Sequence, residues 1–222
     1  MELQLLYCVL IGYAFGCILS AVLVGRLRHI DIFEKGSGNP GMTNTIKVLG
    51  KPAGIAVLVG DILKTLFAVL LCEYLFPEQG TLCALYAGLG VCLGHCFPFW
   101  HHFLGGKGVA CVASAYVLFN PIAGLAALIA GGAVQFFLKK IKLAAAVISA
   151  LFCGWMLISD PRPIALIPAL AMGILMAWLN LRPNRLVDDK KPEPETVKPL
   201  ETDPAISVKR KESVHGTESK TH

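Results

Sequence analysis

A polar, glycine-rich stretch at residues 36–44 contains the residue types best suited to chemistry. It reads Gly-Ser-Gly-Asn-Pro-Gly-Met-Thr-Asn and lies between hydrophobic segments. Glycines allow a sharp turn that exposes backbone N–H groups, and neutral hydroxyl and amide groups can orient an anion. The pattern predicts a phosphate cradle, with an ordinary connecting loop as the alternative. The candidate ligand-binding residues are Gly36, Ser37, Gly38, Asn39, Gly41, Thr43 and Asn44.

A second polar stretch, residues 94–108, reads Gly-His-Cys-Phe-Pro-Phe-Trp-His-His-Phe-Leu-Gly-Gly-Lys-Gly. Lys107 can supply a point charge for a second phosphate, and Gly105, Gly106 and Gly108 leave the N-terminus of the next helix open as a set of N–H donors. It is not a P-loop, because glycine follows the lysine where serine or threonine is required. The aromatic and proline run before it is typical of an anchor at a membrane interface.

His95 has two open interpretations. It could act as a general base for a hydroxyl group, or it could bond to a backbone carbonyl at a helix end. A metal site can also be drawn from Cys92, His95, Cys96, His101 and His102, but its spacing matches no zinc pattern. We therefore expect no metal and no cofactor.

The composition indicates an integral membrane protein. Hydrophobic residues make up 55% of the 222 residues and charged residues 16%, against roughly a quarter charged in soluble domains. Mean hydropathy is +0.63. Most of the eight cysteines fall in apolar segments, so buried thiols are expected.

Seven apolar segments predict an all-α bundle of about seven spans. Gly12, Gly16 and Ser20 recur every four residues in the first, which favours close helix packing. The fourth is short for a span and needs the Gly-Gly-Lys-Gly turn within the membrane boundary. The expected spans are residues 3–24, 54–76, 82–93, 109–119, 122–138, 143–159 and 164–181.

Basic residues concentrate in the membrane body. Residues 1–187 hold 13 basic and 7 acidic groups, and only Arg162 among those basic groups falls on the predicted outer side. The positive-inside tendency therefore puts both polar stretches and the C-terminus in the cytoplasm and the N-terminus outside. Residues 1–186 form the expected membrane domain, and residues 187–222 a disordered polar tail.

Asp61 and Lys64 lie within the second apolar segment, where charged groups are costly. They are interpreted either as functional residues or as partners of each other at i,i+3 spacing.

Taken together, these motifs resemble the bacterial acyl-phosphate:glycerol-3-phosphate acyltransferase family. The resemblance rests on residues 36–44, on Asp61-Ile62-Leu63-Lys64, and on the Gly-His-Cys-Phe-Pro and Gly-Gly-Lys-Gly-Val-Ala runs, and it covers about residues 5–186. It implies a seven-helix protein that moves a fatty acyl group from acyl phosphate to the 1-hydroxyl of glycerol 3-phosphate. Lysophosphatidate and phosphate would be the products, in phospholipid biosynthesis at the bacterial plasma membrane.

The chain departs from the family pattern at three places. Lys47 stands where the family has arginine, which keeps the charge but loses bidentate geometry. Thr65 replaces the glycine after Lys64. The third motif corresponds to residues 180–186, with Asn180 and Arg182 as candidate phosphate ligands. The family carries a histidine three residues before its asparagine. That position is Ala177 if Asn180 is the matching asparagine, and Leu181 if Asn184 is.

The chemistry implied is transfer from an already activated mixed anhydride, which requires positioning and charge neutralisation rather than a protein nucleophile. Ser37, Lys47, His95 and Lys107 are the candidate catalytic residues, and Lys64 is a further substrate ligand. Ser37 as an acylated nucleophile is the weaker alternative to Ser37 as a phosphate ligand, because no G-x-S-x-G elbow surrounds it.

Two other functions stay open: a membrane transporter for phosphate compounds, and a family member that binds acyl phosphate without turnover. The lipid bilayer is the expected environment, nucleic acid is not an expected partner, and a monomer is the simplest expectation.

Overall fold

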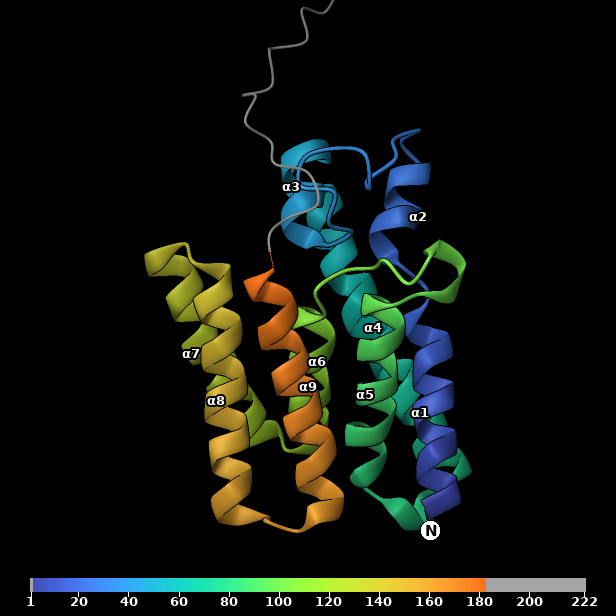
Figure 1. The fold of residues 1–222 in the computed structure, drawn as a ribbon, viewed down its shortest axis with the longest axis vertical. Coiled ribbons are helices and arrows are strands. Elements are labelled where there is room, and N and C mark those ends of the chain that lie inside the picture. Colours follow the sequence, from blue (N-terminus) through green and yellow to red (C-terminus); the bar gives the residue numbers. More distant parts are fainter. Residues whose placement is uncertain (1, 183–222) are drawn as a thin grey trace, which may run out of the picture. The chain divides into compact units, whose positions relative to one another are not determined.

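The computed structural model describes residues 2–182, which form α-helices joined by short loops (Figure 1). The predicted tail, 187–222, lies outside the described residues. The helices are α1 (Glu2–Gly16), α2 (Ser20–Arg26), α3 (Met42–Leu49), α4 (Lys51–Leu75), α5 (Leu82–Cys96), α6 (Val109–Phe119), α7 (Pro121–Leu138), α8 (Ile141–Ser159) and α9 (Pro163–Leu181), with 3-10 turns at Pro77–Gln79 and Phe99–His101.

Six segments of the described chain are long and apolar enough to cross a membrane. The predicted seventh span is α6, whose 11 residues reach about 16 Å at 1.5 Å per residue. Helix α6 ends at Phe119 because the next two residues begin α7. The Asn120 side chain accepts the N–H of Ala123 at 2.9 Å and caps the N-terminus of α7, and Pro121 is the first residue of that helix. The all-helical membrane class is confirmed, whereas the exact count of seven is not.

The predicted small-residue stripe packs α1 against α5. A Cβ added to Gly12 would lie 2.1 Å from the carbonyl oxygen of Ala87, and one added to Gly16 would lie 2.3 Å from that of Val91. Glycine is therefore required where the two backbones touch. All eight cysteines are free and buried, as expected.

The first apolar segment is broken at residues 17–19, where the sequence predicted one continuous span. Three successive carbonyls at the break accept side-chain donors. Lys64 Nζ donates to Ile18 O at 3.0 Å and, more weakly, to Gly16 O at 3.5 Å, and Trp100 Nε1 donates to Cys17 O at 2.8 Å. The break is tolerated because other elements satisfy its backbone groups.

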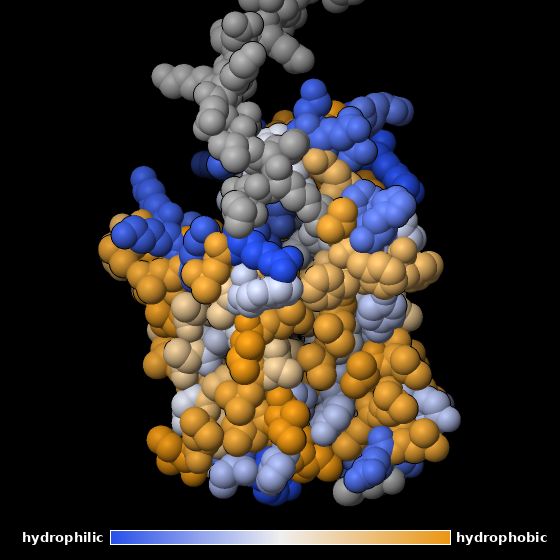
Figure 2. Space-filling model, viewed as in Figure 1, coloured by the Kyte–Doolittle hydropathy of each residue, from blue (hydrophilic) through white to orange (hydrophobic). Residues whose placement is uncertain are grey.

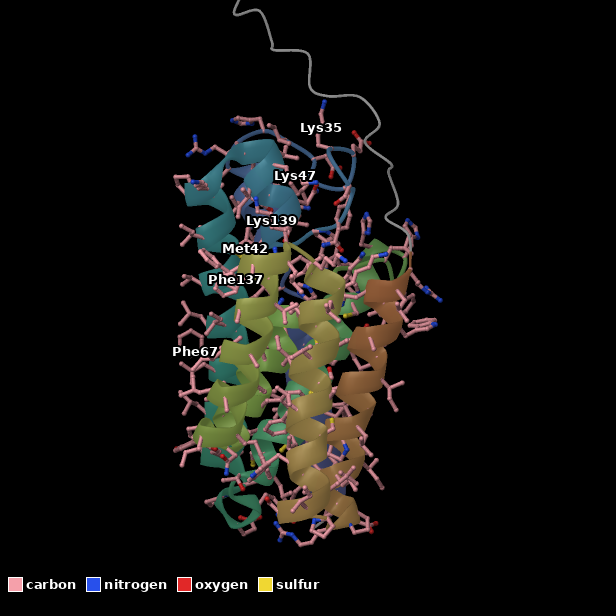
Figure 3. All side chains as sticks on the ribbon, turned by 90° about the vertical axis from the view of Figure 1, so that its left-hand side faces the viewer. Lys35, Met42, Lys47, Phe67, Phe137 and Lys139 are labelled. Atoms are coloured by element: carbon pink, nitrogen blue, oxygen red, sulfur yellow. The ribbon has the colours of Figure 1, made fainter. Side chains whose placement is uncertain are left out.

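The polar loops gather at one end of the bundle. In Figure 1 the loop between α2 and α3, the loop between α5 and α6, the α7–α8 connection and the end of α9 all lie at the upper end. Figure 2 shows hydrophilic residues concentrated there and apolar residues over the helices below. In Figure 3, Lys35, Lys47 and Lys139 lie toward that end, whereas Phe67 lies lower, on the outer side of α4.

Candidate active site

Asn44 organises the first glycine-rich loop. Its side chain is 1% exposed: Oδ1 accepts the N–H of Ser37 at 2.8 Å, and Nδ2 donates to the carbonyls of Ile32 and Lys35 at 3.2 and 3.0 Å. Gly36 has φ +58° and Gly38 has φ +65°, a region that favours glycine. Asn44 was predicted as a substrate ligand, but its hydrogen bonds hold the loop itself.

The second loop is tied back onto the end of α5. The N–H groups of Gly105 and Gly106 donate to the carbonyls of Cys96 and His95 at 2.8 and 2.9 Å. Gly106 lies directly on the His95 ring, since a Cβ there would be 2.2 Å from His95 Nε2. Gly108, at φ +74°, turns the chain into α6, so Lys107 stands at the N-terminus of that helix.

A cavity of about 410 Å³ is lined by residues from the first polar loop, the second polar loop and the motif at the end of α9. Asn39 comes from the first loop, residues 105–107 come from the second, and Arg182 comes from the end of α9. A volume in this range suits a small organic ligand. The remaining lining residues form an apolar wall: Cys96, Phe97, Phe103, Leu104 and Leu179. The sequence did not predict this wall, because the aromatic run at residues 97–100 was interpreted only as an anchor at the membrane interface.

Among the described residues, Lys107 is one of two cationic side chains that line this cavity, with Arg182 as the other. It lines the cavity at the N-terminus of α6, where unpaired backbone N–H groups favour an anion. Partial burial and, secondarily, the nearby Lys142 ammonium lower the pKa of Lys107 below its ordinary range. An anionic ligand would offset both effects by pairing with the ammonium.

Beneath the second loop lies a buried network of charged groups. Lys64 Nζ lies 2.8 Å from Asp61 Oδ1 and 2.8 Å from His95 Nδ1, and Ser20 Oγ donates to Asp61 Oδ1 at 3.0 Å. Asp61, Lys64 and His95 are each at most 5% exposed. The i,i+3 pairing of Asp61 and Lys64 is confirmed, and the additional partners, His95 and Ser20, were not predicted.

His95 belongs to the last turn of α5, which extends three residues beyond the predicted span. An ammonium group has only donors, so Nδ1 accepts from Lys64. Nε2 faces Gly106. The catalytic role predicted for His95 stays a prediction, but this geometry favours a positioning role.

Other predicted site residues lie outside the cavity lining. Lys47 is exposed on α3. Asn180 is buried, and its Nδ2 donates to Met176 O at 2.8 Å.

Arg182 does line the cavity, with its guanidinium 3.5 Å from the Trp178 ring centroid. The predicted residues that come together are Asn39, Gly105, Gly106, Lys107 and Arg182.

The alternative metal set does not assemble in the described part of the chain. The cluster of possible ligands found in residues 2–182 is Asp61, His95 and Cys111, which shares only His95 with that set. Lys64 Nζ lies against both the carboxylate and the imidazole of this cluster, so an ammonium charge is already present where a cation would bind.

The sequence profile of the family described as glycerol-3-phosphate acyltransferase matches residues 6–186. The chain belongs to this family. A glycerol-3-phosphate acyltransferase 1 from Lactobacillus acidophilus is 49% identical over 125 residues, which are 56% of this chain and 60% of the relative. The family's protein from Cupriavidus metallidurans is 43% identical over 154 residues, 68% of this chain and 75% of the relative. The matched region thus spans less than two thirds of the Lactobacillus protein.

Two solved structures of this acyltransferase family share the fold. Both are of PlsY, an integral membrane glycerol 3-phosphate acyltransferase. Its glycerol 3-phosphate form superposes with a TM-score of 0.70 at 26% identity, covering 78% of this chain and 86% of that one. Its lysophosphatidic acid form gives 0.68 at 27% identity, covering 80% and 88%. This chain is therefore a multi-pass integral membrane protein, as predicted.

Proposed function

We propose that the protein transfers a fatty acyl group from acyl phosphate to the 1-hydroxyl of glycerol 3-phosphate, releasing lysophosphatidate and phosphate. The observation that carries the proposal is the single cavity lined by Asn39, Lys107 and Arg182, one residue from each polar motif. Membership of the family supports the acceptor. The acyl-phosphate donor is inferred from the family resemblance of the motifs, and the cations Lys107 and Arg182 in the cavity lining suit its phosphate.

In the proposed reaction, the glycerol 1-oxygen attacks the acyl carbonyl carbon and the bond from that carbon to the phosphate oxygen breaks. Lys107 and the N-terminus of α6 neutralise the leaving phosphate, and Arg182 holds the second phosphate. The lining residues in the described chain include no carboxylate or imidazole. The hydroxyl proton therefore leaves on phosphate, and the apolar wall lies along the acyl chain.

The first loop completes the site in this proposal. Ser37 and Thr43 present their hydroxyl groups to phosphate, while the N–H groups of Ser37, Gly38 and Gly41 are bonded within the loop and hold its shape. Lys47 adds positive charge around the entrance, and Asn180 and Lys64 act by holding the backbone in place. The protein acts in the bacterial plasma membrane with the cavity in the cytoplasm, without a metal or nucleic acid, as a monomer.

The direct test supplies purified protein with palmitoyl phosphate and glycerol 3-phosphate, and measures both phosphate and lysophosphatidate. Lys107→Ala and Ser37→Ala remove two proposed phosphate ligands, and Lys140→Ala is a control at the same end of the bundle but outside the cavity. We expect product from the wild type and the control and a large loss in Lys107→Ala. Palmitoyl-coenzyme A as donor should give no product.

Two outcomes would contradict the proposal. Binding of acyl phosphate without product would leave a binding protein. Uptake of a phosphate compound into sealed vesicles, with no acyl transfer in detergent, would establish a transporter.

A further inference from the structure

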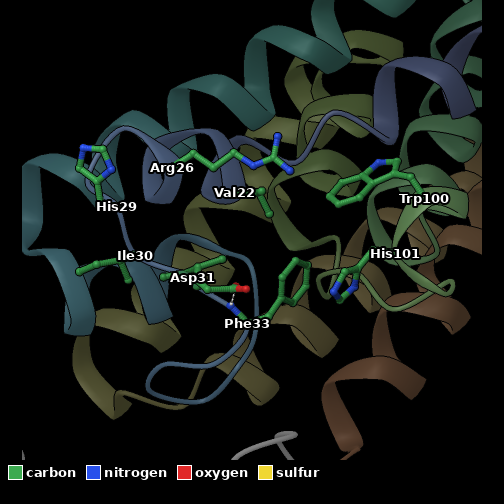
Figure 4. Close-up of a pocket in the computed structure, with 9 residues that line it drawn as sticks. Val22, Arg26, His29, Ile30, Asp31, Phe33, Trp100 and His101 are labelled. Carbon is green, nitrogen blue, oxygen red and sulfur yellow. Dashed lines mark hydrogen bonds between the residues drawn. The ribbon is translucent and has the colours of Figure 1, made fainter.

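A second cavity, of about 390 Å³, shares no lining residue with the candidate active site. Its walls come from α2, from the chain that enters the glycine loop, and from the turn Phe99–His101 (Figure 4). The proposed reaction uses none of its residues. Its lining consists of Val22, Arg26, His29, Ile30, Asp31, Ile32, Phe33, Trp100 and His101.

Three groups that can carry positive charge line this cavity. In Figure 4 the Arg26 side chain extends along one side toward Trp100, and His29 lies at the opposite end from Trp100 and His101. Within residues 2–182 no ion pair joins Arg26 to Asp31, the only acidic residue of the lining. Asp31 Oδ1 instead accepts the N–H of Phe33 at 2.8 Å. The guanidinium donors thus face the cavity without a carboxylate across them.

His101 is held in place for contact with an anion. Its Nδ1 lies 2.8 Å from the carbonyl oxygen of Leu104 and donates to it. Its ring stacks on Phe33, with 3.7 Å between centroids and 11° between planes. Nε2 is the remaining ring nitrogen for contact with a ligand.

The other walls are apolar, and Arg26 and His101 are the last residues of two candidate membrane spans, Glu2–Arg26 and Leu82–His101. Val22, Ile30, Ile32 and Phe33 contribute aliphatic and aromatic surface. The indole N–H of Trp100 is already bonded to Cys17 O, so this 41% exposed side chain offers its apolar ring to a ligand. The cavity is large enough for an organic ligand and much larger than inorganic phosphate needs. Its ligand should therefore carry both a phosphate and an apolar part.

We propose that this cavity binds the phosphate monoester headgroup of a lipid in the same leaflet, outside the candidate active site. Arg26 pairs with the phosphate, His29 adds a ring N–H donor, and the apolar walls contact the start of the acyl chains. This binding does not depend on turnover at the first cavity.

The test measures phosphatidate bound by the intact protein in phosphatidylcholine nanodiscs, by mass spectrometry of the released complex. Arg26→Gln should weaken binding about tenfold, the scale of one lost charge-assisted hydrogen bond. Arg28→Gln, two residues along and outside the lining, should leave it unchanged. Lys107→Gln should also retain binding, because it alters only the first cavity.

Each alternative has its own outcome. Equal losses in Arg26→Gln and Arg28→Gln would mean a diffuse basic surface, and loss in Lys107→Gln alone would place phosphatidate in the candidate active site. Equal binding of phosphatidylglycerol, a phosphodiester, would contradict recognition of a monoester. Displacement of phosphatidate by glycerol 3-phosphate in an Arg26-dependent manner would identify a site for soluble phosphate esters.

Trp100 fluorescence in a Trp155→Phe/Trp178→Phe background provides a second readout, which should change on phosphatidate addition only when Arg26 is present.

Discussion

Lys64 Nζ lies 2.8 Å from His95 Nδ1, directly beneath the glycine turn that carries Lys107. The same nitrogen donates to Asp61 and to carbonyls at the α1–α2 break. One buried ammonium therefore connects the segment leading to the first polar loop with the segment leading to the second. This connection makes the geometry of the candidate active site depend on groups that line no part of it.

Removing Lys64 should destabilise the protein strongly. Lys64→Met leaves the buried Asp61 carboxylate without its counter-charge, at a cost of about 3–5 kcal/mol, whereas Asp61→Asn/Lys64→Met should cost less than the sum of the single changes. Thermal unfolding of detergent-purified variants measures this. Strict additivity of the two losses would show that the pair is not coupled.

The role of His95 can be separated from general base catalysis by two substitutions. His95→Asn places an amide oxygen near the position of Nδ1 and should retain most of kcat, because Lys64 keeps an acceptor. His95→Leu removes that acceptor and should lower both kcat and thermal stability. A general base would give about a 10²–10⁴-fold loss of kcat in both variants, with the protein still folded.

Gly106→Ala should disrupt the second loop, because the added Cβ meets the His95 ring at 2.2 Å. We expect the Michaelis constant for acyl phosphate to rise and kcat to fall as Lys107 is displaced. Gly132→Ala in α7 is the matched control, since a Cβ there has no neighbour within 4 Å. Wild-type kinetics in Gly106→Ala would mean that the turn can shift without consequence.

The lowered pKa of Lys107 predicts a pH dependence. The lysine is charged below its pKa, and the proposed pairing with phosphate needs that charge. Affinity for acyl phosphate should therefore fall as pH rises through that pKa, earlier than for an ordinary lysine. Lys142→Gln removes one of the causes and should move the fall to higher pH, as should Lys107→Arg. Lys140→Gln is the control. If affinity for acyl phosphate falls at the same pH in the wild type and in all three variants, a group other than Lys107 titrates.

Much of the arrangement was predictable from local sequence. The compositions of residues 36–44 and 105–108 marked both as sharp, glycine-dependent turns, and the spacing of Gly12 and Gly16 indicated close helix contact before any partner was known. The convergence of Asn39, Lys107 and Arg182 also followed from placing their loops at one membrane face.

What the sequence did not reveal depends on contacts between distant segments. A hydropathy profile reads residues 3–24 as continuous, because the break after Gly16 changes backbone geometry without changing composition. His95 and Ser20 join the Asp61–Lys64 pair from other helices, and no local pattern records that meeting. Asn44 resembled the neighbours that were predicted with it to bind a ligand, and it could be recognised as a support only from its burial and hydrogen bonds.

The broken first helix also bears on the order in which the chain assembles in the bilayer. The donors for the carbonyls of Gly16, Cys17 and Ile18 are Lys64 and Trp100, which the ribosome adds some 46 to 83 residues later. When the first segment enters the membrane alone, an unbroken helix satisfies those carbonyls best. We therefore expect the kink to form late, once α4 and the turn Phe99–His101 lie beside α1, and the glycine loop to reach its final position only at that stage.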